Sequence, residues 1–218
     1  MRKALVMLAI AAAAGGIGGV KAASTNDPYL WLEDVSSPKA LQWVEAHNAK
    51  STAMLEADPR YKQFYSQALE IAQAEDRIPV GEFIGGQIYN FWQDKDHVRG
   101  IWRRASIESY SSGKPQWETV LDLDALAASE KANWVWKGAQ CSRPAERRCL
   151  INLSDGGEDA VTIREFDLPT KSFVKGGFVL PKGKQRVAWE NDNVLLISRE
   201  WRKGDLGRTG YLFIAKRL

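Results

Sequence analysis

The stretch NWVWKGAQCSRPAERRCLINLS, residues 133–154, places two strand-like runs on either side of a polar, charged connection. Two such runs around a short segment with a proline are typical of a β-hairpin. Cys141 and Cys149, the two cysteines of the chain, stand at the ends of the connection. We therefore predict a disulfide between them, across the neck of the hairpin. Two free thiols are the alternative, and zinc is disfavoured because no histidine lies nearby.

Strand-like segments recur from residue 80 to the end of the sequence, with turn residues between them. The expected strands span residues 86–94, 98–106, 117–123, 133–140, 148–154, 160–168, 172–180, 186–192, 194–201 and 209–217. Strands of this length, with turns this regular, favour an all-β sandwich, barrel or propeller.

A weak internal repeat favours the propeller. Trp136 opens one strand pattern and Trp189, 53 residues later, opens a similar one. A period near fifty residues with three or four strands fits propeller blades better than a sandwich. The tryptophans within strand patterns are expected in the core rather than on a sugar-binding surface: Trp102, Trp134, Trp136 and Trp189.

Residues 38–77 show helical periodicity instead. Pro38 begins the first helix, and Ser37 before it is the expected N-cap. The ADPR sequence at 57–60 breaks the pattern, and a second helix is expected from Tyr61 to Ala74. The predicted organisation is a helical arm over residues 23–78, followed by a β-rich domain over residues 79–218.

Residues 1–22 are predicted to be a signal peptide, cleaved near Ala22. Arg2 and Lys3 precede an apolar segment rich in alanine and glycine, which is short for a membrane anchor. Without this segment the formal net charge falls from +3 to zero, so nucleic acid is not an expected partner. Export, most simply to a periplasm, agrees with the predicted disulfide.

The sequence contains no recognisable catalytic, cofactor or metal motif. A Gly-x-Ser-x-Gly pattern is missing, and Ser154 is only a partial match. Nothing in the sequence pairs His47 or His97 with a serine and an acid. The acidic residues of two turns are expected to be solvated rather than to bind calcium: Asp94, Asp96, Asp155, Glu158 and Asp159.

The sequences DPYLWLED at 27–34 and VEAHN at 44–48 resemble the N-terminus of prolyl oligopeptidases, serine peptidases that include oligopeptidase B. Weaker likeness extends over residues 27 to 218. The resemblance implies a mainly β fold, with an N-terminal helical arm followed by about two to three blades of a seven-bladed propeller. It also implies a C-terminal α/β-hydrolase domain that carries the Ser, Asp and His of the triad and lies outside this sequence, with no cofactor or metal.

The resemblance therefore assigns no catalytic residue here. It gives the N-terminal motif a structural role in docking on the hydrolase domain: Asp27, Pro28, Tyr29, Trp31, Leu32, Glu33 and Asp34. The expected function is the propeller portion of an exported peptidase that hydrolyses short peptides, where it gates access to the hydrolase. A secreted peptide- or glycan-binding module and a non-functional truncated relic are the alternatives. We expect residues 23–218 alone to be marginally stable, because an incomplete propeller exposes strand edges.

Overall fold

The computed structural model describes residues 27–207 and 211–218. The predicted signal peptide, residues 1–22, lies outside the described residues. The chain divides into two compact units, residues 1–64 and 65–218. In the part of the chain that the structure describes, no helix is both long and apolar enough to cross a membrane.

The described part of the first unit is helical, and its long helix begins at Pro38, as the sequence predicts. A 3-10 helix, η1 (Leu30–Glu33), precedes α1 (Pro38–Glu56). The helix α2 (Tyr61–Gln73) begins after the predicted break, at the end of the first unit, and its remainder belongs to the second unit. The hydroxyl of Ser37 accepts a hydrogen bond from the backbone N–H of Ala40 at 3.2 Å. This bond satisfies one free donor of the first turn of α1, so the predicted N-cap is confirmed.

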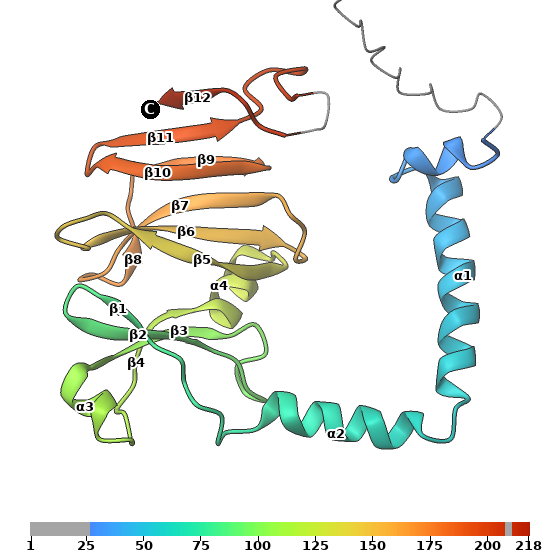
Figure 1. Cartoon of the computed structure of the whole chain (residues 1–218), viewed down its shortest axis with the longest axis horizontal. Coiled ribbons are helices and arrows are strands. Elements are labelled where there is room, and N and C mark those ends of the chain that lie inside the picture. Colours follow the sequence, from blue (N-terminus) through green and yellow to red (C-terminus); the bar gives the residue numbers. More distant parts are fainter. Residues whose placement is uncertain (1–26, 208–210) are drawn as a thin grey trace, which may run out of the picture. The chain divides into compact units, whose positions relative to one another are not determined.

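The second unit contains three antiparallel sheets in chain order (Figure 1). The first sheet consists of β1 (Glu82–Ile84), β2 (Gln87–Trp92), β3 (Ile101–Ser106) and β4 (Glu118–Asp122). The second consists of β5 (Trp134–Cys141), β6 (Arg148–Asp155), β7 (Val161–Asp167) and β8 (Ser172–Phe173), with β9 (Val179–Gly183) paired to β7. The third consists of β10 (Gln185–Asn191), β11 (Val194–Arg199) and β12 (Ala215–Arg217). The prediction of a mainly β chain is confirmed.

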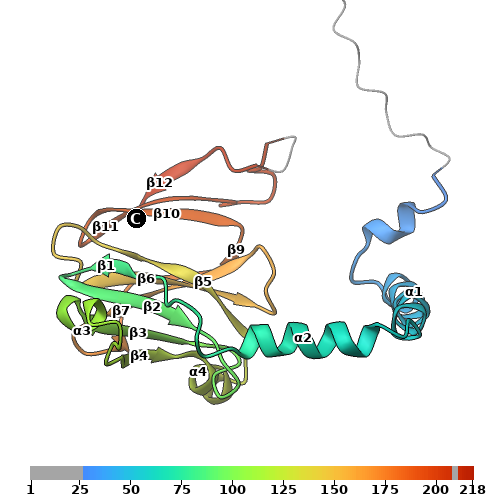
Figure 2. The same ribbon diagram turned by 60° about the horizontal axis from the view of Figure 1, so that its bottom comes forward.

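The three sheets stack face to face, as the two views of Figures 1 and 2 show. One buried cluster joins the first and second sheets and includes Trp102, Leu153 and Phe166. A second cluster joins the second and third sheets through Leu150 and Leu195, among others. Because successive side chains of a strand point to opposite faces, β6 supplies both clusters. The second sheet is therefore buried on both faces.

The tryptophan prediction holds fully for Trp102, which is 3% exposed. Trp136 is half-buried and stacks on Phe91, with ring centroids 5.0 Å apart. Trp134 and Trp189 are also half-buried. The indole N–H of a half-buried tryptophan can still find a partner at the edge of the core, as the N–H of Trp189 does with the carbonyl of Gln140 at 2.8 Å.

The single strand expected over residues 172–180 is wrong, since β8 and β9 are separate strands. The reason is the carboxylate of Glu165, which is 3% exposed. It accepts a hydrogen bond from the backbone N–H of Phe178 at 2.8 Å. The chain turns around this buried group at Gly176, whose φ of +74° favours glycine.

Two short helices were not predicted, α3 (Ile107–Ser111) and α4 (Leu123–Glu130). Each has an N-cap that the sequence displays. The hydroxyl of Ser106 accepts from the N–H of Ser109, and the carboxylate of Asp122 accepts from the N–H of Ala125. These caps stop the preceding strands β3 and β4, so the chain turns immediately after each strand.

Candidate functional site

The hairpin of β5 and β6 forms as predicted, with Cys141 and Cys149 directly opposite each other in its register. In the structure a disulfide joins the two residues, whose Cα atoms are 3.9 Å apart. The side chain of Cys149 is fully buried in the cluster between the first and second sheets. The disulfide therefore closes a surface loop directly above the core.

This loop, residues 142–148, contacts both neighbouring sheets. The backbone N–H of Gly85, in the turn between β1 and β2, donates to Oε2 of Glu146 at 2.8 Å. On the other side, the buried hydroxyl of Ser142 donates to the carboxylate of Asp192, in the turn between β10 and β11. We call the loop the clasp, because it connects all three sheets at one edge.

The residues considered for catalysis make local structural contacts. Nδ1 of His47 lies 2.8 Å from the carbonyl oxygen of Trp43, and the His47 ring stacks on the Trp43 ring. The hydroxyl of Ser154 is buried and donates to the carbonyl of Glu158 at 2.7 Å. His97 lies against Asp94, with Nδ1 and Oδ1 2.9 Å apart. These contacts pair neither histidine with a serine.

The expectation of a solvated carboxylate is wrong for Asp94. Its carboxylate accepts from the indole N–H of Trp92 at 3.0 Å and from the backbone N–H groups of Asp96 and His97. Burial alone would raise the pKa of Asp94, but the hydrogen bonds from His97 and Asp96 outweigh it and hold this pKa below its usual range. Asp94 therefore organises the turn after β2.

The other turn carboxylates are exposed, as expected: Asp96, Asp155, Glu158 and Asp159. Within residues 27–207 and 211–218, no cluster of three or more His, Cys, Asp or Glu side chains could hold a metal ion.

The motif of residues 27–34 lies in the first unit and folds around η1. The carboxylate of Asp27 accepts from the backbone N–H of Tyr29 at 2.8 Å. The Trp31 ring packs edge-on against Trp43 of α1, and Nζ of Lys39 lies 4.3 Å from the Trp31 ring centroid. Tyr29 remains 57% exposed. The motif thus keeps apolar surface available, and its docking role stays a prediction.

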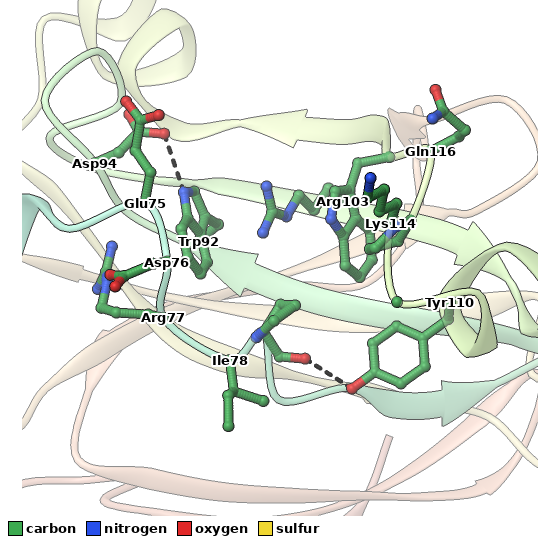
Figure 3. A pocket seen from close by; sticks show the side chains of 14 residues that line it. Glu75, Asp76, Arg77, Ile78, Trp92, Asp94, Arg103, Tyr110, Lys114 and Gln116 are labelled. Carbon is green, nitrogen blue, oxygen red and sulfur yellow. Dashed lines mark hydrogen bonds between the residues drawn. The ribbon is translucent and has the colours of Figure 1, made fainter.

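Sequence reasoning missed a pocket of about 880 Å³ on the second unit (Figure 3). Residues 75–79, the end of β2 and the segment 110–117 line it. Its centre is a stack of charged and aromatic groups. The guanidinium of Arg103 lies 4.3 Å from the ring centroid of Trp92 and 4.4 Å from that of Trp117. Arg77 lies 4.4 Å from the Trp92 ring centroid.

The strand register explains this stack. Arg103 of β3 is paired with Asn90 of β2 and with Thr119 of β4. Trp92 and Trp117 are each two residues from those partners, so they are diagonal neighbours of Arg103 on the same face. The alternation N-x-W at 90–92 and W-x-T at 117–119 was the available signal, but it needs the register to be read.

The electrostatics of Arg103 are unusual in this chain. Its Nε donates to Oδ1 of Asn90 at 2.9 Å, but no carboxylate lies within ion-pair distance among the described residues. Burial, opposed by the charge of Asp94 and assisted by that of Arg77, lowers the pKa of Arg103 to about 10. By contrast, the partly buried Arg148 and Arg164 each bind a carboxylate.

Comparison with known proteins identifies the fold. The family of prolyl oligopeptidase N-terminal β-propeller domains matches residues 17–211. An uncharacterized peptidase of Sinorhizobium fredii is 48% identical over 88% of this chain, and an uncharacterized peptidase of Rickettsia prowazekii is 30% identical over 73% of it. The chain covers 26% and 23% of these relatives, about a quarter of their length.

Solved structures agree. The structure of a post-proline cleaving enzyme from Rickettsia typhi matches 86% of this chain at 29% identity with a TM-score of 0.78, and 30% of that enzyme is covered. Oligopeptidase B from Leishmania major shares the fold, with a TM-score of 0.54 at 14% identity over 88% of this chain and 26% of that enzyme. The three sheets are thus part of a propeller, as predicted, and the chain belongs to the prolyl oligopeptidase family.

Proposed function

We propose that this chain is the propeller portion of an exported peptidase that hydrolyses short peptides, and that it gates access to a hydrolase domain. The similarity to the post-proline cleaving enzyme of Rickettsia typhi carries this proposal, because it extends over 86% of the chain with a TM-score of 0.78. The signal-peptide pattern of residues 1–22 supports export, and we place the protein in a periplasm.

The contacts in the second unit suit a rigid domain that restricts access better than a site of catalysis. The second sheet is buried on both faces, which makes the stack rigid. The buried hydroxyl of Ser154 donates to the carbonyl of Glu158, and His97 contacts Asp94, so the described contacts place no histidine against this hydroxyl to make it a nucleophile. In this proposal the chain limits the size of what enters, and the chemistry comes from the hydrolase domain.

The first test uses native protein, captured from its source cells with an antibody to residues 27–48. We expect the captured protein to react with a fluorophosphonate and to cleave a proline-containing reporter peptide. The same cleavage site inside a folded protein should remain intact, because in this proposal the propeller keeps folded proteins away from the hydrolase domain. The recombinant 218-residue chain should cleave neither substrate. Native protein without fluorophosphonate labelling would contradict the proposal.

Export has its own test. Fractionation of the source cells should recover the protein with periplasmic markers, and N-terminal sequencing should begin close to Ala23. A cytoplasmic protein that retains Met1 or its neighbours would overturn the proposed location without affecting the family assignment.

A further inference from the structure

The two cysteines of the clasp disulfide have different surroundings. Cys149 lies inside the second sheet, where its register partners are Cys141 of β5 and Phe166 of β7, and its side chain is fully buried. Cys141 is half-buried and ends β5, which is the edge strand of this sheet. The sheet therefore covers Cys149 on both sides, whereas Cys141 has a side that no strand of the second sheet covers.

A cavity of about 410 Å³ lies beside this edge, and we call it the clasp cavity. Parts of β1, β5, β10 and the clasp line it. Cys141 is one of its lining residues, and Cys149 is not. The volume falls within the roughly 300–1,000 Å³ that is typical of small-molecule pockets. A small molecule in this cavity would therefore meet the disulfide at Cys141.

The charges that line the clasp cavity are mixed. Arg143 lies 3.5 Å from Glu146, measured from Nε to Oε1, and Glu82 adds a second carboxylate. The side chain of Arg143 is 88% exposed. Because both signs of charge are present, the cavity suits an uncharged or zwitterionic small molecule better than a strongly charged one.

Thiol–disulfide exchange depends on such access. A thiolate attacks one sulfur in line with the S–S bond and expels the other sulfur. An attack on Cys149 would have to pass through the cluster between the first and second sheets. An attack on Cys141 comes from the clasp cavity and expels the sulfur of Cys149 into that cluster, where a buried thiol is stable.

We propose that Cys141 is a thiol-exchange site, attacked from the clasp cavity by a small thiol, and that this exchange opens the clasp. A new S–S bond forms between the thiol and Sγ of Cys141, and the Cys141–Cys149 bond breaks. The proton of the attacking thiol is lost to water, and Cys149 takes up a proton to become a thiol. With a dithiol, its second sulfur then displaces the first from Cys141, which leaves two cysteine thiols and an oxidised dithiol.

The closed clasp is a restrained conformation, so cutting its neck should release it. Glu146 has a φ of +48°, which is unfavourable for a residue with a side chain. Its carboxylate nevertheless accepts from the N–H of Gly85 in the first sheet. Ser142, which follows Cys141 directly, bonds to Asp192 in the third sheet. Without the disulfide Glu146 can relax, and the clasp loses its hold on the first sheet.

The position of the adduct tests the site of attack. Native protein from its source cells is incubated with glutathione, quenched in acid to protonate the thiolates, and digested with pepsin for mass spectrometry. We expect about tenfold more glutathione on Cys141 than on Cys149, because only Cys141 is accessible. In urea the two cysteines should be labelled about equally. Equal labelling of the folded protein, or no adduct on it, would overturn the proposal.

Hydrogen exchange tests the opening of the clasp. Adduct formation should make the N–H of Gly85 exchange about tenfold faster, as expected for the loss of a hydrogen bond to a charged acceptor. The N–H of Ala125 is the internal control, because it also donates to a carboxylate, that of Asp122, away from the clasp. Unchanged exchange at Gly85 in the adduct would contradict the opening.

A variant pair in the native gene assigns this signal to Glu146. Glu146→Gln keeps an acceptor for Gly85 and should respond to glutathione as the native protein does. Glu146→Ala removes the acceptor, so exchange at Gly85 should be fast before glutathione is added and should not rise further. A further rise in Glu146→Ala would show that another contact protects Gly85. Neither readout uses peptidase activity, so both hold whether or not the proposed function is correct.

Discussion

Arg103 and Arg104 are neighbours on β3, yet they have opposite environments. Arg104 lies on the face toward the second sheet, where its Nε donates to Oε2 of Glu118 at 2.6 Å. The hydrogen bond to Glu118 raises the pKa of Arg104 above its usual value, whereas burial lowers that of Arg103 to about 10. On this inner face of the first sheet, Arg104 is therefore held by an ion pair with Glu118. On the opposite, outer face of the first sheet, Arg103 lies between the rings of Trp92 and Trp117 without an ion pair among the described residues, although Glu75, Asp76 and Asp94 line the same pocket. The two neighbours thus show that aromatic rings can hold a guanidinium where an ion pair does not.

The largest expected difference between the two faces concerns tryptophan. Trp102→Ala on the inner face should reduce the free energy of unfolding by about 3–5 kcal/mol, because a fully packed ring is lost. Trp117→Ala on the outer face should cost only about 1 kcal/mol, since the half-buried ring mainly covers Arg103. Urea denaturation of both variants, introduced into the native gene, measures the difference. Equal losses would show that the two faces are equally packed.

The next largest expected change in the free energy of unfolding comes from removing the disulfide of the clasp. Removing the disulfide with Cys141→Ala and Cys149→Ala should lower the free energy of unfolding by roughly 2–3 kcal/mol, because an unfolded chain without the short closed loop has more conformational entropy. Denaturation with and without a reductant checks this value in the unaltered chain. Glu146→Gln is the milder companion, because the amide oxygen can still accept from Gly85. A loss confined to the variant, and not seen on reduction, would point to packing of Cys149 instead.

Much of the fold followed from local patterns. The helix over Pro38–Glu56 was predictable because its N-cap, its proline and its break are all encoded within a few residues. The β5–β6 hairpin was predictable for the same reason, since its cysteines mark its neck. Short-range rules of this kind need no knowledge of distant partners.

The outer face and the break at Gly176 were not predictable in this way. Arg103 meets Trp92 and Trp117 only through the pairing of three strands, with an irregularity in the register after Trp102. The break depends on the carboxylate of Glu165, which lies on another strand. Both features arise from contacts between separate segments, and strand register sets such contacts.

The two arginines themselves give a smaller and more direct test. Arg104→Gln should reduce the free energy of unfolding by about 1–2 kcal/mol, because Tyr89 loses its charged donor and Glu118 keeps only Lys171. Arg103→Gln should change it by less than about 1 kcal/mol, since the lost contacts with two rings are offset by the removal of a desolvated charge. Urea denaturation of both variants, introduced into the native gene, compares the two losses. A larger loss for Arg103→Gln would show that the contacts of Arg103 with the two rings outweigh the removal of a desolvated charge.

The smallest expected effect is a pH dependence of the free energy of unfolding, which comes from Glu118, the partner of Arg104. Hydrogen bonds from Arg104 and then Lys171 lower the pKa of Glu118 from 4.5 to about 2. A carboxylate whose pKa is lower in the folded state stabilises the fold above its unfolded pKa, and this contribution disappears as the pH falls through the folded pKa. The contribution of Glu118 should therefore be full above about pH 4.5 and vanish near pH 2.

The side chain of Glu118 is 48% exposed, so solvent screening limits this contribution to about 0.5–1 kcal/mol. Urea denaturation of the native sequence and of Glu118→Gln, from neutral pH to about pH 2, should give two curves that converge in acid. Glu70→Gln, at an exposed position without an ion pair among the described residues, is the control. In Glu118→Gln, Arg104 is left without a carboxylate, as Arg103 is in the native chain. Curves that stay parallel down to pH 2 would mean that Glu118 does not distinguish the two arginines.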